Sequence, residues 1–231
     1  MAKEKVIVAN WKAWIGPVET GKWFDGFLPR YQPTPNLRVV IAVGYPQLAE
    51  AAARVRGHAG LAIAAQVVSP YPAGGYTGAV PARWLKGLAE YVLVGHRERE
   101  KYFKETDREF ALQVSEARHA GLQPIVCMDR NQARSRIRAI DHERGEAALF
   151  GYTPSEAESL EWVDDQREII ETAELIIALS GGGRVLYGGG VDRKNAAPLM
   201  KLPGLSGLLV GRGCLDPGDF VDLLRNVASP S

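Results

Sequence analysis

The sequence predicts an α/β fold in which eight parallel strands, alternating with helices, close into a single (β/α)8 barrel. Eight short apolar runs recur along the 231 residues, and stretches with helical spacing lie between several of them. The runs are continuous rather than alternating, as in strands that are buried on both faces. Eight such units without an interdomain linker favour a closed barrel over an open sheet. We therefore expect one domain over residues 1–231.

The elements follow from these runs in chain order. The predicted strands are residues 6–8, 39–41, 61–63, 91–94, 124–126, 147–150, 185–187 and 207–210. Helical spacing of apolar residues predicts helices over 47–55, 105–120, 159–179 and 217–227, among others. Glycine and proline occur at the strand ends rather than in one linker. The chemistry of such a barrel is expected at the carboxyl ends of its strands.

Composition and charge indicate which partners and cellular locations to expect. The formal net charge is +1, without a basic tail or stripe, so no nucleic-acid partner is expected. No apolar run approaches the roughly 18 residues of a membrane helix, and the N-terminus lacks a signal segment, so a cytoplasmic location and no membrane partner are expected. Cys127 and Cys214 are far apart and are interpreted as core residues. No cluster has the spacing of metal ligands, so no metal is expected.

Polar residues follow the first and fourth strands. Asn10 and Lys12 would bring an amide and an ammonium group to the barrel mouth, where Lys12 either binds an anionic substrate or is simply solvated. His96 follows the fourth strand, and a neutral imidazole there would donate a hydrogen bond to a carbonyl that becomes an enolate. The alternative is a packed histidine. Glu98 is either part of an ion pair at the mouth or a surface charge.

Two glycine clusters follow the last two strands, at residues 188–190 and 211–213. Backbone amides without side chains at this place form the usual phosphate site of such barrels. Gly189, Gly190, Gly211 and Arg212 are therefore the predicted phosphate-binding residues.

Six motifs occur in a fixed order along nearly the whole chain. They are Asn-Trp-Lys (10–12), Gln-Val-Val-Ser-Pro-Tyr (66–71), Gly-Gly-Tyr-Thr-Gly (74–78), Val-Gly-His-Arg-Glu-Arg (94–99), Leu-Tyr-Gly-Gly-Gly-Val (186–191) and Leu-Val-Gly (209–211). Together they resemble the triosephosphate isomerase family.

This resemblance implies a TIM barrel that interconverts dihydroxyacetone phosphate and glyceraldehyde 3-phosphate through an enediolate, without metal or cofactor, in glycolysis and gluconeogenesis. Lys12 and His96 would polarise the substrate oxygens, and Asn10 would position Lys12. Thr77 falls where the third loop of the family reaches into a partner subunit. A homodimer formed through this loop is therefore expected.

The chain departs from the family around the expected site. The catalytic glutamate of the family stands in a Tyr-Glu-Pro tripeptide, and Thr153 replaces it here. A hydroxyl is too weak a base for carbon deprotonation at neutral pH. Thr153 and Glu156 also match a helix-capping box, which predicts a strand joined directly to a helix without the phosphate lid of the family. Arg97 replaces a serine, and Arg212 replaces a glycine.

Three hypotheses follow. In the first, the chain is a weakened sugar-phosphate isomerase in which Glu156, Glu158 or Asp129 takes the proton. In the second, it is a non-catalytic relative that binds a small anionic ligand or serves as a regulatory or scaffold protein, because Arg97, Arg130 and Arg212 would make the mouth basic. In the third, it is a barrel enzyme with another reaction on a larger substrate.

Overall fold

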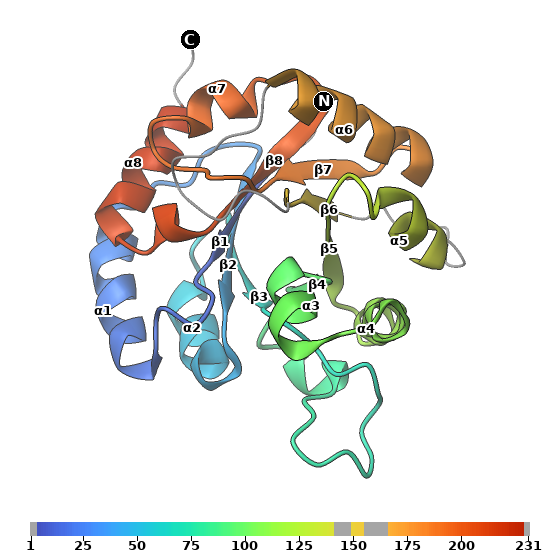
Figure 1. The fold of residues 1–231 in the computed structure, drawn as a ribbon. Coiled ribbons are helices and arrows are strands. Elements are labelled where there is room, and N and C mark those ends of the chain that lie inside the picture. Colours follow the sequence, from blue (N-terminus) through green and yellow to red (C-terminus); the bar gives the residue numbers. More distant parts are fainter. Residues whose placement is uncertain (1–3, 141–148, 155–165, 229–231) are drawn as a thin grey trace.

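The computed structural model describes residues 4–140, 149–154 and 166–228, and its eight strands form one closed parallel barrel in the order β1 to β8 (Figure 1). The strands are β1 (Lys5–Asn10), β2 (Leu37–Val43), β3 (Leu61–Ala65), β4 (Tyr91–Val94), β5 (Gln123–Met128), β6 (Leu149–Tyr152), β7 (Arg184–Tyr187) and β8 (Leu205–Val210). Closure occurs where β8 pairs with β1, with Val6 opposite Gly207. The predicted fold class is confirmed.

All eight predicted strands are present because both faces of each strand are buried. Alternate residues of the eight strands meet in a core inside the barrel, where Val8, Leu93 and Ile125 are almost inaccessible to solvent. The other residues of the strands pack outward against the helices in a second, larger cluster. This double burial explains the continuous apolar runs. Residues 147 and 148, at the start of the predicted sixth strand, lie outside the described residues.

Helices surround the strands (Figure 1). They are α1 (Pro17–Phe27), α2 (Leu48–Val55), α3 (Arg97–Phe103), α4 (Asp107–His119), α5 (Ala133–Ile140), α6 (Gln166–Ser180), α7 (Ala196–Met200) and α8 (Pro217–Ala228), with short 3-10 helices η1 (Leu28–Arg30), η2 (Tyr45–Gln47), η3 (Ala82–Leu85) and η4 (Arg212–Cys214). The predicted helices over 47–55, 105–120 and 217–227 correspond to α2, α4 and α8. Of the predicted helix over 159–179, residues 159–165 lie outside the described residues.

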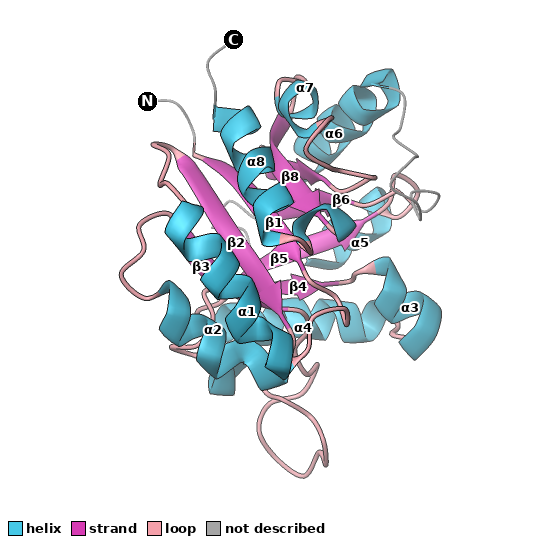
Figure 2. Cartoon of the chain, turned by 90° about the vertical axis from the view of Figure 1, so that its left-hand side faces the viewer, coloured by secondary structure: helices cyan, strands magenta, loops and turns pink. Residues whose placement is uncertain are grey.

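The alternation of strand and helix changes at the third unit. Only η3 lies between β3 and β4, whereas two helices, α3 and α4, follow β4. The long loop between β3 and η3 projects beyond the helices in both views (Figures 1 and 2). Helix α3 lies beside the end of β4 rather than in the outer ring (Figure 1). These two irregular segments stand at the carboxyl ends of their strands, where the functional residues are expected.

None of the helices in the described ranges is long and apolar enough to cross a membrane.

Candidate active site

A cavity of about 200 Å³ opens at the carboxyl ends of the strands. Its lining combines residues from the ends of β1, β4, β6, β7 and β8, and among those described they are Lys12, Trp14, His96, Arg97, Glu98, Lys101, Tyr102, Thr153, Pro154, Gly188 and Arg212. Five of the residues that the sequence predicted for the site therefore meet here: Lys12, His96, Glu98, Thr153 and Arg212. Barrel closure brings them together although they span 200 positions of the chain.

Lys12 is held in an unusual backbone conformation at the end of β1. Its φ is +52°, in the left-handed region that residues other than glycine seldom adopt. The side chain of Asn10 accepts a hydrogen bond from the Lys12 amide at 3.0 Å, and Gln66 donates to the Lys12 carbonyl at 2.9 Å. These two bonds maintain the strained turn. The bond to Asn10 fits the positioning role that the resemblance implied, and Gln66, which the sequence offered only as part of a motif, is a second support for the Lys12 backbone.

Glu98 is the ionic partner of Lys12. The ammonium nitrogen of Lys12 lies 2.6 Å from Oε1 of Glu98. Partial burial alone would raise the pKa of Glu98, but the hydrogen bond from Lys12 and the charges of Lys12 and Arg97 lower it below its usual value. Glu98 is therefore an ionised carboxylate at neutral pH and a poor proton acceptor. An anionic ligand would compete with it for Lys12.

His96 is buried at the N-terminus of α3, with 8% of its surface exposed. Its Nδ1 accepts a hydrogen bond from the Glu98 amide at 3.3 Å, so this nitrogen carries no proton. Burial is the main cause that lowers the pKa of His96 to about 4; the charge of Glu98 opposes this shift, whereas the charges of Lys12 and Arg97 add to it. The imidazole is therefore neutral at physiological pH and carries its proton on Nε2. A neutral donor of this kind suits a substrate oxygen that gains negative charge.

Thr153 lies at the end of β6 and is 4% exposed. Its amide donates to the Met128 carbonyl at 2.8 Å, and its hydroxyl makes a long contact of 3.5 Å with the same oxygen. The hydroxyl is thus directed to β5, and it has no carboxylate partner among the described hydrogen bonds. The capping glutamate Glu156, the candidate base Glu158 and the predicted direct join of strand and helix lie outside the described residues.

Arg97 crosses the mouth from α3 to β6. Its Nη1 donates to the Pro154 carbonyl at 2.7 Å, and both residues line the cavity. Lys101 and Arg212 add two more cationic side chains to the lining. The described part of the lining therefore holds four basic residues and one carboxylate, that of Glu98. The prediction of a basic mouth is confirmed for Arg97 and Arg212.

Two sequence-based expectations for the mouth are wrong. Arg130 points to α6, where it donates to Thr172 Oγ1 at 3.0 Å and pairs with Glu171. Asp129 accepts from the Gln132 amide at 2.9 Å and so stabilises its own turn. Neither residue belongs to the described lining of the cavity. Both follow β5, but Arg130 reaches α6 and Asp129 accepts a hydrogen bond within its own turn.

The glycine loops after β7 and β8 border the cavity in part. Gly188 lines it directly, and its amide donates to the Tyr152 carbonyl at 2.8 Å. Gly211 lies next to Lys12, because a Cβ on Gly211 would stand 3.7 Å from the Cε atom of Lys12. Gly189 and Gly190 are not in the described lining. Gly190 has a φ of +56°, which a glycine adopts without strain.

Cys127 and Cys214 are buried free thiols, as the sequence analysis expected. Burial raises the pKa of Cys127 to about 12 and also raises that of Cys214, so both are protonated at neutral pH. Over residues 4–140, 149–154 and 166–228, no group of three His, Cys, Asp or Glu side chains is arranged to hold a metal ion.

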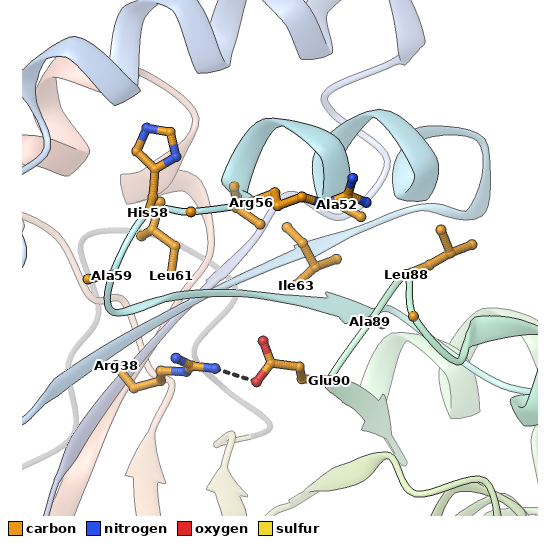
Figure 3. Close-up of a pocket in the computed structure, with 13 residues that line it drawn as sticks. Arg38, Ala52, Arg56, His58, Ala59, Leu61, Ile63, Leu88, Ala89 and Glu90 are labelled. Atoms are coloured by element: carbon orange, nitrogen blue, oxygen red, sulfur yellow. Dashed lines mark hydrogen bonds and ion pairs between the residues drawn. The ribbon is translucent and has the colours of Figure 1, made fainter.

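A second, larger cavity of about 540 Å³ lies at the amino-terminal ends of β3 and β4, beside α2 (Figure 3). Leu61 and Ile63 face it from β3, but they are only 5% and 3% exposed, so a ligand would gain little from covering them. Arg38 and Glu90 at its edge form an ion pair with each other. The smaller cavity is the better candidate for the active site because reactive groups of such barrels gather at the carboxyl ends of the strands.

Comparison with known proteins agrees with this geometry. The family model described as triosephosphate isomerase matches residues 5–227. Curated proteins named triosephosphate isomerase are similar over almost their full length. That of Paracidovorax citrulli is 32% identical, over 99% of this chain and 100% of the relative, and that of Deinococcus radiodurans is 31% identical, over 96% and 98%. That of Solibacter usitatus is 30% identical, over 96% of this chain and 99% of the relative. A match that runs from the first strand to the last helix shows that the chain belongs to the triosephosphate isomerase family.

Proposed function

We propose that this chain binds a triose phosphate at the mouth of the barrel and interconverts dihydroxyacetone phosphate and glyceraldehyde 3-phosphate at a reduced rate. The observation that carries the proposal is the presence of Lys12 and a neutral His96 on one small cavity. These two groups are the electrophilic half of an isomerase site. They stabilise negative charge on the substrate oxygens during enediolate formation.

The remaining residues have supporting roles in this proposal. Asn10 holds the backbone of Lys12, and Glu98 holds its ammonium group until the anionic substrate arrives. The phosphate would be bound by the amides of Gly189, Gly190 and Gly211, with the guanidinium of Arg212 beside them. The proposed reaction uses neither a metal nor an organic cofactor, as the resemblance implies, and Lys12 and His96 polarise the substrate oxygens in place of a metal ion.

The proton acceptor limits the rate. Glu98 is the only carboxylate in the described lining, and its pKa is lowered by Lys12, so it is a weak base. Loss of a positioned base costs about 10²- to 10⁴-fold in rate. Glu156 remains the weak candidate for a replacement base.

A second candidate function is the binding of a small anionic ligand without turnover, for regulation or scaffolding. Four basic side chains against one carboxylate in the described lining favour it. A ligand that needs no proton removed would use the charges of Arg97, Lys101 and Arg212 without requiring a base. The third hypothesis, another reaction on a larger substrate, requires a carboxylate free to face the ligand, and the described lining offers none.

The deciding experiment is coupled turnover of glyceraldehyde 3-phosphate by the purified chain beside a His96→Gln variant. We expect slow turnover that falls at least about tenfold in the variant, because the donor to the substrate oxygen is removed. Equal background rates for both proteins would refute the isomerase proposal.

A binding assay separates the two candidate functions. Inorganic phosphate, pyrophosphate and small dicarboxylates should raise the melting temperature of the chain, since a ligand that binds the native state stabilises it. Lys12→Met should reduce the shift. A shift without turnover would support the non-catalytic function.

We also propose a homodimer formed through the loop that contains Thr77. Thr77 is exposed, and Tyr71 and Tyr76 stack on each other in the same loop at 4.7 Å between ring centroids while remaining 41% and 44% exposed. Exposed aromatic groups of this kind mark interaction surfaces. A cytoplasmic location stays a prediction from the sequence.

A further inference from the structure

One arginine links two elements of the mouth that lie far apart in the chain. Arg97 is the first residue of α3, and its Nη1 donates to the carbonyl of Pro154, just beyond β6, at 2.7 Å. Both residues line the cavity. A guanidinium donor makes this a charge-assisted hydrogen bond, which is stronger than a neutral one.

The hydrogen bond from Arg97 to Pro154 lies one residue beyond the last backbone hydrogen bonds of β6. The Thr153 amide donates to Met128 of β5, and the Gly188 amide donates to Tyr152, each at 2.8 Å. Pro154 has no amide hydrogen, so it cannot extend this ladder as a donor. Its carbonyl is its only backbone hydrogen-bonding group, and Arg97 occupies it.

Helix α3 is itself a fixed support. Arg136 of α5 is almost fully buried and donates to the carbonyl of Gly95 at 2.7 Å, immediately before His96. Arg136 also forms an ion pair with Glu100 of α3. The start of α3 is therefore attached to the barrel wall independently of Arg97. The hydrogen bond from Arg97 to Pro154 therefore attaches the residues after β6 to a helix that is itself held in place.

We propose that Arg97 is a positioning residue that holds Thr153 and Pro154 in place across the cavity from His96. Residue 153 is the position from which a base would act in the proposed reaction. Its placement relative to His96 therefore governs proton transfer. This role rests on the proposed isomerase function, but the bond itself is tested without turnover. Arg97 thus acts through the end of β6 rather than as a reacting group.

The first test uses Arg97→Met, Arg97→Lys and, as control, Arg130→Met. Amide hydrogen exchange is measured at Thr153 and Gly188. In Arg97→Met we expect exchange about tenfold faster at both amides, the effect of losing one hydrogen bond to a charged donor. Arg97→Lys keeps one donor and should retain most of the protection, and Arg130→Met should not change it. Unchanged exchange in Arg97→Met would overturn the proposal.

The second test separates positioning from attraction of the anion. Steady-state kinetics with glyceraldehyde 3-phosphate should show kcat lowered about tenfold in Arg97→Met, with a smaller change in KM and recovery in Arg97→Lys. A rise in KM alone would show that Arg97 only attracts substrate, which contradicts the positioning role. If the unaltered chain shows no turnover, the isomerase function fails, and the exchange data decide on Arg97 by themselves.

Discussion

Burial of His96 determines the protonation state of the candidate site. The ring lies at the start of α3 with its Nδ1 turned to the Glu98 amide, so Nε2 is the donor that remains for a ligand. Sequence alone left open whether this histidine is a ligand-facing donor or a packed core residue. The structure shows both properties in one side chain, because His96 is buried and also lines the cavity.

The lowered pKa of His96 predicts a pH dependence of stability. The folded-state pKa is about 4 and the usual value is 6.5, so the unfolded chain binds more protons between these two values. Stability therefore falls as the pH drops from about 6.5 toward about 4, by roughly 2 kcal/mol from this group at about pH 5. His96→Gln should lose less stability than the unaltered chain between about pH 7.5 and about pH 5 in urea unfolding. Parallel losses in both proteins would contradict the neutral, buried histidine.

Thr153 stands at the position where the resemblance implies the catalytic base. Replacing it with glutamate puts a carboxylate into a cavity that already holds Lys12 and His96. We expect Thr153→Glu to raise kcat/KM for glyceraldehyde 3-phosphate, by up to about 10²- to 10⁴-fold if the base is well positioned. Thr153→Gln has a similar size without the basic group and serves as the matched control. An equal effect of both substitutions would show that the added carboxylate does not act as a base.

At the scale of elements, a buried arginine joins α5 to α3 and β5. Arg136 donates to the carbonyls of Gly95 and Cys127, pairs with Glu100 and lies over the ring of Phe110. Burial lowers its pKa to about 10, so it remains charged at neutral pH. The bounds of α5 were not predicted from the sequence, and its buried face carries the charged Arg136 where an apolar residue is usual.

Arg136→Met should therefore destabilise the protein strongly. It removes a buried charge, the ionic partner of the Glu100 carboxylate and a donor to two carbonyls, a loss of about 3 to 5 kcal/mol. Urea unfolding measures the change. Arg130→Met breaks an ion pair whose side chains are 40% and 44% exposed, and should cost less than about 1 kcal/mol. Adding Glu100→Gln to Arg136→Met should recover part of the stability, and a double variant less stable than Arg136→Met would contradict this account.

The other elements differ in how well the sequence predicted them. Helix α4 was predicted from the helical spacing of its apolar residues, and the structure adds a capping box of Thr106 and Glu109 at its start. Helix α3 was not predicted because its seven residues, mostly charged, bury no side chain. The replacement of a helix by η3 between β3 and β4 was also missed. Short elements are held by tertiary contacts rather than by a periodic pattern.

At the scale of the whole molecule, closure of the barrel depends on one glycine. Gly207 of β8 lies opposite Val6 of β1, and a Cβ at this position would stand only 1.8 Å from the Val6 carbonyl oxygen. The seam between the first and last strands therefore has no room for a side chain. The glycine clusters after β7 and β8 were predicted from the sequence to bind phosphate, whereas no role was predicted for this glycine.

Gly207→Ala should accordingly destabilise the whole barrel, by at least about 1 to 3 kcal/mol, because the strands must separate or shift in register. Gly75→Ala is the matched control, since a Cβ there meets no atom within 4 Å and its φ is not in the left-handed region. Thermal unfolding of the two variants provides the measurement. Equal melting temperatures would contradict the close approach of β8 to β1.

The proposed homodimer predicts the mass of the molecule in solution. Sedimentation at micromolar concentration should give twice the 25.2 kDa mass of the chain. Thr77→Arg should shift the equilibrium to monomers, because it places a large charge in the projecting loop. Glu174→Arg on the exposed face of α6 is the control and should leave the mass unchanged. A monomeric unaltered chain would refute the homodimer.

The sequence by itself determined the class of fold, the eight strands and the family, since continuous apolar runs and ordered motifs are local properties of the chain. It also identified Lys12, His96 and Thr153, because strand ends in such a barrel share one mouth. Only the tertiary structure decided which charges face that mouth: Arg97 and Arg212 do, whereas Arg130 turns to α6. It alone revealed Gln66, Arg136 and the seam at Gly207. The reason is physical, because side-chain direction, burial and pairing depend on contacts between residues that lie far apart in the chain.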